Sequence, residues 1–289
     1  MMHTLNSPTL KVELNSTGAE LSSITTKTGK EYIWQANPKW WVGRAPVLFP
    51  ILCSMKNNAY TYKGKPYNMT KHGFVRSAEF TTTGVDGNKI TFEYTQNEET
   101  LKMYPFNFLF QVIFELTNNT LSTTYRVENH NNHPMPFSFG SHEAYRCPHN
   151  ENEVFEDYYI EFEKPGTYIS ETVEGVLLNG DVYSVIENDN VLPLHYGLFK
   201  HDTLIFKNVM SSKLSLKSKK SSTTIEIDYQ NAPHLGIWTK PGAPYICIEP
   251  WFGLPDYKNH NGDIEKKDGI KIVEANESFA WTHTITINE

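Results

Sequence analysis

Three consecutive segments of the chain read Phe108-Leu-Phe-Gln-Val-Ile-Phe-Glu-Leu116, Thr117-Asn-Asn-Thr120 and Leu121-Ser-Thr-Thr-Tyr-Arg-Val127, and they decide the fold class. Every second residue of Phe108–Leu116 is apolar, and Leu121–Val127 carries Leu121, Tyr125 and Val127 on the same period, which is that of a strand with one buried face. The asparagines between them favour a tight turn, because their side chains tolerate a left-handed backbone. The stretch therefore predicts an antiparallel hairpin.

Alternation recurs at Lys89–Tyr94, Thr223–Tyr229 and Phe279–Ile287, and Tyr60–Tyr67 predicts a second hairpin around Lys63-Gly64. The Lys/Ser run Lys213–Lys220 predicts a solvated strand face and turn. Helical patterns are scarce, and Asn97–Met103 predicts one or two helical turns. Strands at short spacing predict an all-β fold, a large antiparallel β-sandwich. Since no repeat or linker divides the sequence, we predict a single domain over residues 1–289.

Composition excludes several classes of function. The 289 residues carry a formal net charge of −7, which argues against nucleic acid or an anionic membrane as partner. The chain contains no run of about 18 apolar residues, so we predict no membrane span. The amino terminus has no pattern of a secretory signal, and the three cysteines follow no paired spacing. We therefore expect reduced thiols in a cytoplasmic protein.

One carboxylate lies in an apolar setting, in Tyr245-Ile-Cys-Ile-Glu-Pro-Trp-Phe-Gly-Leu-Pro255. Burial disfavours the charged form of Glu249 and raises its pKa towards the range useful for proton transfer. Pro250 cannot donate to a sheet ladder, so we expect the strand to end there and to present Glu249 as a candidate general base. The alternative is a structural glutamate in an ion pair.

Four further candidates break the alternating pattern. Arg44 is the one charge in an apolar stretch, which indicates either a ligand contact or a buried ion pair. His72 and Arg76 share a face if their segment is extended. Asp202 precedes an apolar strand, where its alternative role is that of a turn residue.

A fifth candidate is His142, which follows the small residues Gly140-Ser141 and could be presented at the end of a sheet. The nearby histidines His130, His133 and His149 fit no established metal-ligand spacing, and we predict no metal site. Phosphate-cradling glycine loops, dinucleotide fingerprints and nucleophile elbows are absent, so covalent and nucleotide chemistry have no signature.

Taken together and in order, these segments resemble the aldose 1-epimerase (galactose mutarotase) superfamily, and most closely its LacX-like branch of galactose mutarotase-related proteins. The resemblance rests on Arg44–Pro50, His72–Arg76, Tyr104–Phe106, Ser138–His142, Leu198–Asp202 and Cys247–Trp251. It implies a β-supersandwich with an open cleft, and interconversion of the α and β anomers of a free aldohexose such as galactose or glucose, without a cofactor. The partner would be a small sugar; the oligomeric state is not predicted.

The resemblance also implies roles for single residues. Glu249 matches the base that takes the proton of the anomeric hydroxyl, and His142 matches the acid that protonates the ring oxygen. His72, Arg44 and Asp202 match residues that position the sugar. Because ring opening needs a proton acceptor and a proton donor, we expect the first two side chains to face each other across a space of sugar-ring size.

Two alternatives remain open within this fold. The short His-Gly-Phe-Val-Arg form at His72–Arg76 also resembles the hexose-6-phosphate epimerase branch, in which Arg44, Arg76 and Lys71 could bind the phosphate. The second alternative is a carbohydrate-binding protein that has kept the cleft and lost catalysis.

Overall fold

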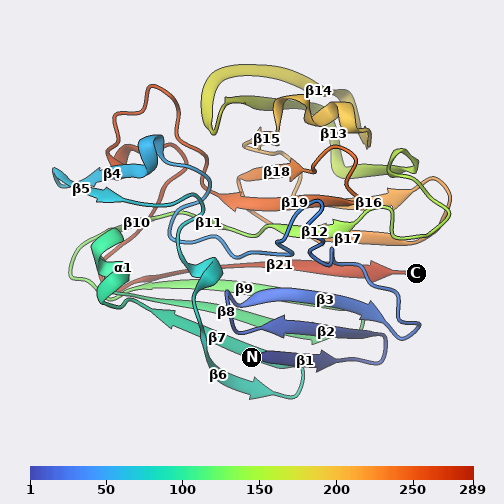
Figure 1. Cartoon of the computed structure of the whole chain (residues 1–289), viewed down its shortest axis with the longest axis horizontal. Helices are drawn as coiled ribbons and strands as arrows, with labels where there is room; N and C mark the ends of the chain where they lie inside the picture. The colour runs from blue at the N-terminus through green and yellow to red at the C-terminus, as the bar shows by residue number, and fades with distance from the viewer.

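The computed structural model describes residues 1–289 and is built almost entirely of strands (Figure 1). The strands of the first half are β1 (Met2–Asn6), β2 (Leu10–Asn15), β3 (Glu20–Thr26), β4 (Ala59–Tyr62), β5 (Lys65–Asn68), β6 (Thr81–Asp86), β7 (Lys89–Thr95), β8 (Phe108–Thr117), β9 (Thr120–Asn129), β10 (Met135–Phe137), β11 (Phe139–Gly140) and β12 (Glu143–Arg146). The remaining strands are β13 (Tyr158–Glu174), β14 (Leu177–Pro193), β15 (Leu204–Lys207), β16 (Lys213–Ser218), β17 (Thr224–Asp228), β18 (His234–Trp238), β19 (Tyr245–Phe252), β20 (Lys271–Val273) and β21 (Ser278–Asn288).

Helical structure is limited to short pieces. They are α1 (Glu98–Met103) and the 3-10 helices η1 (Lys56–Asn58), η2 (Val75–Ser77), η3 (Phe155–Asp157), η4 (Tyr196–His201) and η5 (Ile264–Lys266). The side chain of Asn97 caps α1 by accepting from the amides of Glu99 and Thr100, so the predicted helical turns are confirmed. None of these helices has the length and apolar character that a membrane crossing requires.

The hairpin that decides the fold class is confirmed. Strands β8 and β9 pair antiparallel up to Thr117 and Thr120, and Asn118 in the two-residue turn has a φ of 51°. Such turns match the twist of the strands when the first central residue takes a positive φ, which asparagine tolerates. The hairpin β4–β5 follows the same rule, with Lys63 and Gly64 at positive φ.

Fourteen strands form one antiparallel sheet. Its path runs β11-β19-β18-β15-β13-β16-β17-β21-β9-β8-β7-β6, and off this path β12 pairs with β19 and β14 with β13. The sheet bends back on itself, as contacts between aromatic side chains of its two halves show. Phe252 of β19 lies 5.3 Å from Phe279 and 5.4 Å from Trp281 of β21, measured between ring centroids. The two layers enclose the core, and the prediction of an all-β antiparallel sandwich is confirmed.

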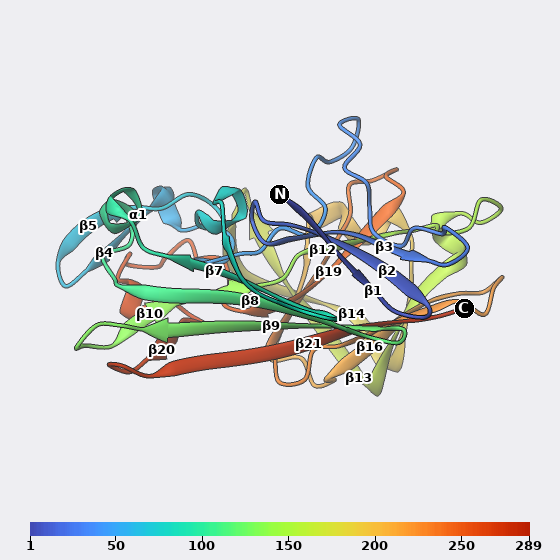
Figure 2. The same cartoon turned by 90° about the horizontal axis from the view of Figure 1, so that it is seen from below.

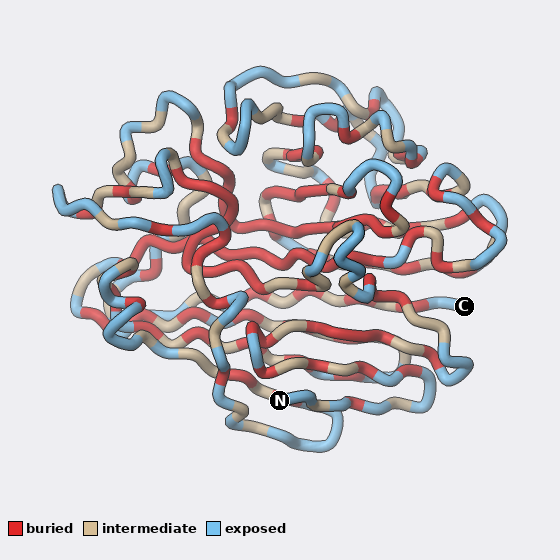
Figure 3. The backbone as a smooth tube through the Cα atoms, in the orientation of Figure 1, coloured by how far each residue is buried: buried red, intermediate tan, exposed pale blue.

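A second, three-stranded sheet, β1–β3, lies over the β6–β8 end of the large sheet (Figure 2). The His3 ring contacts the Phe92 ring of β7 edge-on, and its Nε2 lies 3.1 Å from the Thr82 hydroxyl of β6. The main cluster of 63 buried residues extends from Leu5 to Ile287, so both ends of the chain contribute to one core. A single domain over residues 1–289 stays a prediction. Figure 3 shows the longest buried stretches in the middle of the large sheet, along β19 and its neighbours.

The prediction that the strand ends at Pro250 is wrong, since β19 continues to Phe252. Proline can stay inside this strand because of what lies beside it. The Pro250 carbonyl accepts from the amide of Ser141, so the missing N–H would point to the same side, into the interruption between β11 and β12. The ladder on this side is therefore broken at Pro250 itself, and the strand continues beyond it.

Candidate active site

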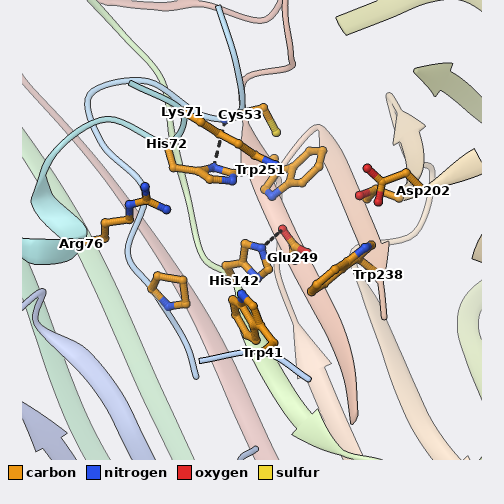
Figure 4. A pocket seen from close by; sticks show the side chains of 12 residues that line it. Trp41, Cys53, Lys71, His72, Arg76, His142, Asp202, Trp238, Glu249 and Trp251 are labelled. Atoms are coloured by element: carbon orange, nitrogen blue, oxygen red, sulfur yellow. Dashed lines mark hydrogen bonds and ion pairs between the residues drawn. The ribbon is translucent and has the colours of Figure 1, made fainter. Parts of the chain in front are cut away.

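A cavity of about 230 Å³ opens at the outer face of β18 and β19 (Figure 4). Its walls consist of three tryptophans, two histidines, two carboxylates, two cations and three small or apolar residues: Trp41, Trp238, Trp251, His72, His142, Asp202, Glu249, Lys71, Arg76, Pro46, Cys53 and Thr203. Five of the six predicted site residues line this cavity, and Arg44 does not. Aromatic faces mixed with a few polar groups are typical of small-molecule sites.

Glu249 lies inside β19 rather than at its end. Residues alternate between the two faces of a strand, so Cys247, Glu249 and Trp251 face the cavity side while Ile248 faces the main core. The side chain of Glu249 is only 2% exposed. Burial raises the pKa of Glu249 well above its usual value, and the nearby charge of Lys71 opposes part of this rise. The predicted desolvated carboxylate is therefore present.

His142 is placed by the register of the interrupted strand β11–β12 against β19. Gly140 pairs with Trp251 and Glu143 pairs with Ile248, so the register continues across the interruption and sets His142 directly opposite Glu249. Directly opposed residues have neighbouring side chains on one face. Accordingly, His142 Nε2 lies 3.4 Å from Glu249 Oε2.

This contact corrects one prediction. Glu249 and His142 do not face each other across a space of sugar-ring size, because a ring cannot lie between atoms 3.4 Å apart. The two side chains instead stand side by side in the cavity wall (Figure 4). A sugar would have to present one edge to both groups.

The surroundings of His142 are aromatic. The Trp41 ring stacks on the imidazole with centroids 5.0 Å apart, and the Trp238 ring meets it edge-on at 6.2 Å. Burial lowers the pKa of His142 to about 4, so its imidazole is neutral at physiological pH. Because burial raises the pKa of Glu249, a single proton on this pair binds the carboxyl group in preference to the imidazole.

His72 is fixed in one tautomer by the backbone of Cys53. Its Nδ1 accepts from the Cys53 amide at 3.1 Å, and its own amide donates to the Cys53 carbonyl at 2.9 Å. Burial lowers the pKa of His72 well below its usual value, so the ring is neutral and carries its proton on Nε2. His72 thus offers the cavity a hydrogen-bond donor. The segment is not extended, since Gly73 turns it and η2 follows.

Asp202 lies at the cavity rim, between η4 and β15, in a strained backbone conformation. Its φ of 70° and ψ of −132° belong to a region that non-glycine residues rarely occupy. Its carboxylate is exposed and forms no hydrogen bond or ion pair within the chain. Strain of this kind collects at functional positions, where the surrounding structure enforces it.

The cations are distributed unevenly. Arg76 and Lys71 line the cavity, and neither forms an ion pair. Arg44 does not line it: the Glu20 carboxylate accepts from the Arg44 amide at 3.2 Å, while the Arg44 Nε is buried without a hydrogen-bond partner. The alternative of a buried ion pair at Arg44 is not realised either, and its role in sugar positioning stays a prediction.

Sequence reasoning did not select the tryptophan walls. Trp238 and Trp41 belong to distant segments. The pairing of β18 with β19 brings Trp238 to His142, and the loop after β3 brings Trp41 there. Cys247 was missed as well, although period two places it on the same face as Glu249. With His142 these two residues form a group of three side chains whose ligand atoms lie within 4.8 Å of one another. His130, His133 and His149 lie outside that group.

Comparison with known proteins gives concordant results. The family model described as aldose 1-epimerase matches residues 1–286. The protein LacX (chromosomal) of Lactococcus lactis subsp. lactis is 34% identical over 288 residues, covering 96% of both chains. The structure of a galactose mutarotase related enzyme from Lactobacillus acidophilus superposes with a TM-score of 0.96 at 34% identity, covering 100% of this chain and 98% of that one. A galactose mutarotase-like protein from Lactobacillus casei gives 0.93 at 30% identity, with 100% of each chain covered.

Proposed function

The chain belongs to the aldose 1-epimerase family, and we propose that it is an isomerase which interconverts the α and β anomers of an aldohexose such as galactose or glucose without a cofactor. The observation that carries the proposal is the buried contact of 3.4 Å between Glu249 and His142 in the cavity wall. A carboxyl group and an imidazole are the pair that hemiacetal ring opening needs.

The side-by-side arrangement suits the two reacting oxygens. The anomeric hydroxyl oxygen and the ring oxygen are both bonded to C1, so they lie on one edge of the sugar. Glu249 takes the proton from the hydroxyl, and His142 gives a proton to the ring oxygen as its bond to C1 breaks. The open aldehyde rotates about the C1–C2 bond and closes on its other face, with the two groups exchanging roles.

One proton on the pair is enough for ring opening. The raised pKa of Glu249 and the lowered pKa of His142 favour that proton on the carboxyl group, whereas ring opening requires a carboxylate beside an imidazolium. Conversion moves that proton to His142 over the 3.4 Å contact and adds no net charge to the interior. Lys71 favours the carboxylate, and the Trp41 face stacked on His142 favours the imidazolium through its π-electrons.

Other groups in the cavity would orient the sugar. His72 presents its Nε2–H, from which a sugar oxygen can accept. The Trp251 side chain lies in the same wall and favours the carboxylate form of Glu249. Asp202 supplies an acceptor for hydroxyl groups at the rim. Such contacts align the reacting atoms before the proton moves.

A direct test follows the optical rotation of freshly dissolved α-D-galactose and α-D-glucose. We expect the protein to accelerate the approach to equilibrium well above the spontaneous rate. If it binds these sugars in calorimetry without accelerating the change, the carbohydrate-binding alternative holds and the proposal is wrong.

Replacement of Asp202 by Gly should separate stability from activity. Glycine adopts the observed backbone without the strain of a side chain, so we expect the free energy of unfolding to rise by about 1 kcal/mol, net of the greater freedom of the unfolded chain. Loss of a charged hydrogen-bond acceptor should lower kcat/KM by about 10- to 100-fold. Urea unfolding and polarimetry measure the two effects; a variant that is less stable and equally active would contradict both.

A second candidate substrate is a hexose 6-phosphate, and one observation favours it. Lys71 and Arg76 line the cavity without carboxylate partners, and both also line an adjoining hollow with Asn57, Asn58 and Thr70. Unpaired cations beside amide groups suit a phosphate.

The two substrates can be distinguished with Arg76→Ala. If the phosphate ester is the substrate, its kcat/KM should exceed that of galactose and should fall about 10-fold or more in Arg76→Ala, with little change for galactose. Arg146→Ala is the matched control, because Arg146 is exposed and does not line the cavity. Equal losses for both sugars would assign Arg76 to the free hexose.

A further inference from the structure

Beneath the Glu249–His142 pair lies a buried thiol that the proposed reaction does not use. Cys247 precedes Glu249 by two residues on the same face of β19, and it is fully buried among aromatic rings that include Trp41 and Trp238. Its Sγ, the Nε2 or Nδ1 of His142 and a carboxylate oxygen of Glu249 all lie within 4.8 Å of one another. Cys53, the other thiol near the cavity, belongs to no such group.

We propose that His142, Cys247 and Glu249 form a binding site for a thiophilic metal ion of the Zn²⁺ type, and that the bound ion inhibits the enzyme. Three protein ligands from N, S and O donors, with a fourth position left for an outside group, are a recurrent arrangement for zinc. The fourth position here would open into the cavity.

The distances fit tetrahedral coordination with small movements. Zinc–ligand bonds of about 2.0–2.3 Å place neighbouring ligand atoms of a tetrahedron ~3.4 Å apart. His142 Nε2 and Glu249 Oε2 already have a separation of 3.4 Å. The thiol lies no more than 4.8 Å from the other two ligand atoms, so it has to approach by at most about 1.4 Å, which a rotation about its Cα–Cβ bond can supply. Thiolate and imidazole select zinc-like ions over Mg²⁺ and Ca²⁺, which prefer oxygen.

The charge balance also permits the ion. Binding of one divalent cation displaces the protons of its ligand groups to solvent. The sum of Zn²⁺, one thiolate and one carboxylate is zero. No net charge is therefore added to the buried wall. Gly236, opposite Glu249 on β18, adds no side chain to this part of the wall.

Binding can be tested without reference to activity, by titrating the protein with Co²⁺ as a spectroscopic substitute. We expect a thiolate-to-cobalt charge-transfer band in the wild type, its loss in Cys247→Ala, and its retention in Cys53→Ala. Zn²⁺ affinity from competition should fall at least about 100-fold in Cys247→Ala, because loss of an outer-shell partner alone costs 10–100-fold. Glu249→Gln, which keeps the shape of the side chain, should also weaken binding.

A band that survives in Cys247→Ala, or disappears in Cys53→Ala, would overturn the site. Thermal melting without metal shows whether each variant is folded. If Cys247→Ala does not fold, the loss of metal binding in Glu249→Gln tests the site instead. The inhibition rests on the proposed function: Zn²⁺ should reduce the anomer interconversion of the wild type, and Cys247→Ala should need at least tenfold more Zn²⁺ for half-inhibition, by the same reasoning about lost ligands. A protein that binds Co²⁺ but converts no sugar would refute the function and leave the site standing.

Discussion

Replacement of Glu249 by Gln is expected to slow anomer interconversion by about 10²- to 10⁴-fold, the usual contribution of a positioned acid or base. The amide has the size and shape of the carboxyl group but cannot accept the proton of the anomeric hydroxyl. Polarimetry on fresh α-D-galactose measures the effect. Conversion at the wild-type rate would remove Glu249 from the mechanism.

The same substitution should stabilise the folded protein at neutral pH. Because burial raises the pKa of Glu249 in the folded state, the folded protein holds this proton more tightly than the unfolded chain does. Stability is therefore lost as pH rises from the unfolded pKa, near 4.5, towards the raised folded value. A glutamine carries no such penalty, so its advantage should vanish at acid pH and grow towards pH 7.

Glu143 provides a matched control on the opposite face of the neighbouring strand. Its carboxylate lies 3.2 Å from Nε2 of the buried His283. Burial works to raise the pKa of Glu143, but the charge and hydrogen bonding of His283 hold it below its usual value. Its charged form therefore contributes stability above pH 4.5, and Glu143→Gln should be less stable at neutral pH. Urea unfolding at two pH values should show opposite signs for the two variants; equal signs would mean that Glu249 is a structural carboxylate.

Period-two patterns predicted the fold because they report local burial. The hairpins at Asn118 and Lys63 and the capped turn at Asn97 depend on neighbours within a few residues, and all three are confirmed. The end of β19 was predicted wrongly at Pro250 for the opposite reason. Whether a strand tolerates proline depends on the adjacent strand, and the interruption at Ser141 cannot be read from the β19 segment.

The same distinction between local and long-range features applies to the candidate site. Glu249 could be found because its apolar neighbours are its sequence neighbours. Its contact with His142 depends on the register of two strands that are about a hundred residues apart, and period-two reasoning gives faces but not partners. Trp238 shows the limit most clearly, since only the pairing of β18 with β19 brings it beside the imidazole.

Replacement of Lys267 by Met is expected to lower the free energy of unfolding by about 3–5 kcal/mol. The Lys267 Nζ lies 2.6 Å from Asp256 Oδ1, and the two side chains are 1% and 0% exposed. Methionine fills the space of the lysine stem but leaves the aspartate buried without its counter-charge. Chemical unfolding in urea measures the loss, which would stay below about 1 kcal/mol if the pair behaved like an exposed ion pair.

The double variant Lys267→Met/Asp256→Asn separates the lost pair from lost packing, and most of the stability should return in it. An asparagine oxygen can still accept from the Lys56 amide, as Asp256 Oδ2 does at 2.8 Å, while no charge remains to be compensated.

Loss of the ion pair should also affect the cavity, because the Asp256 amide donates to the Ser54 carbonyl beside Cys53. Cys53 in turn fixes the tautomer of His72. Lys267→Met should therefore lower kcat as well as stability, and the double variant should recover both; recovery of stability alone would show that this ion pair does not support the position of His72.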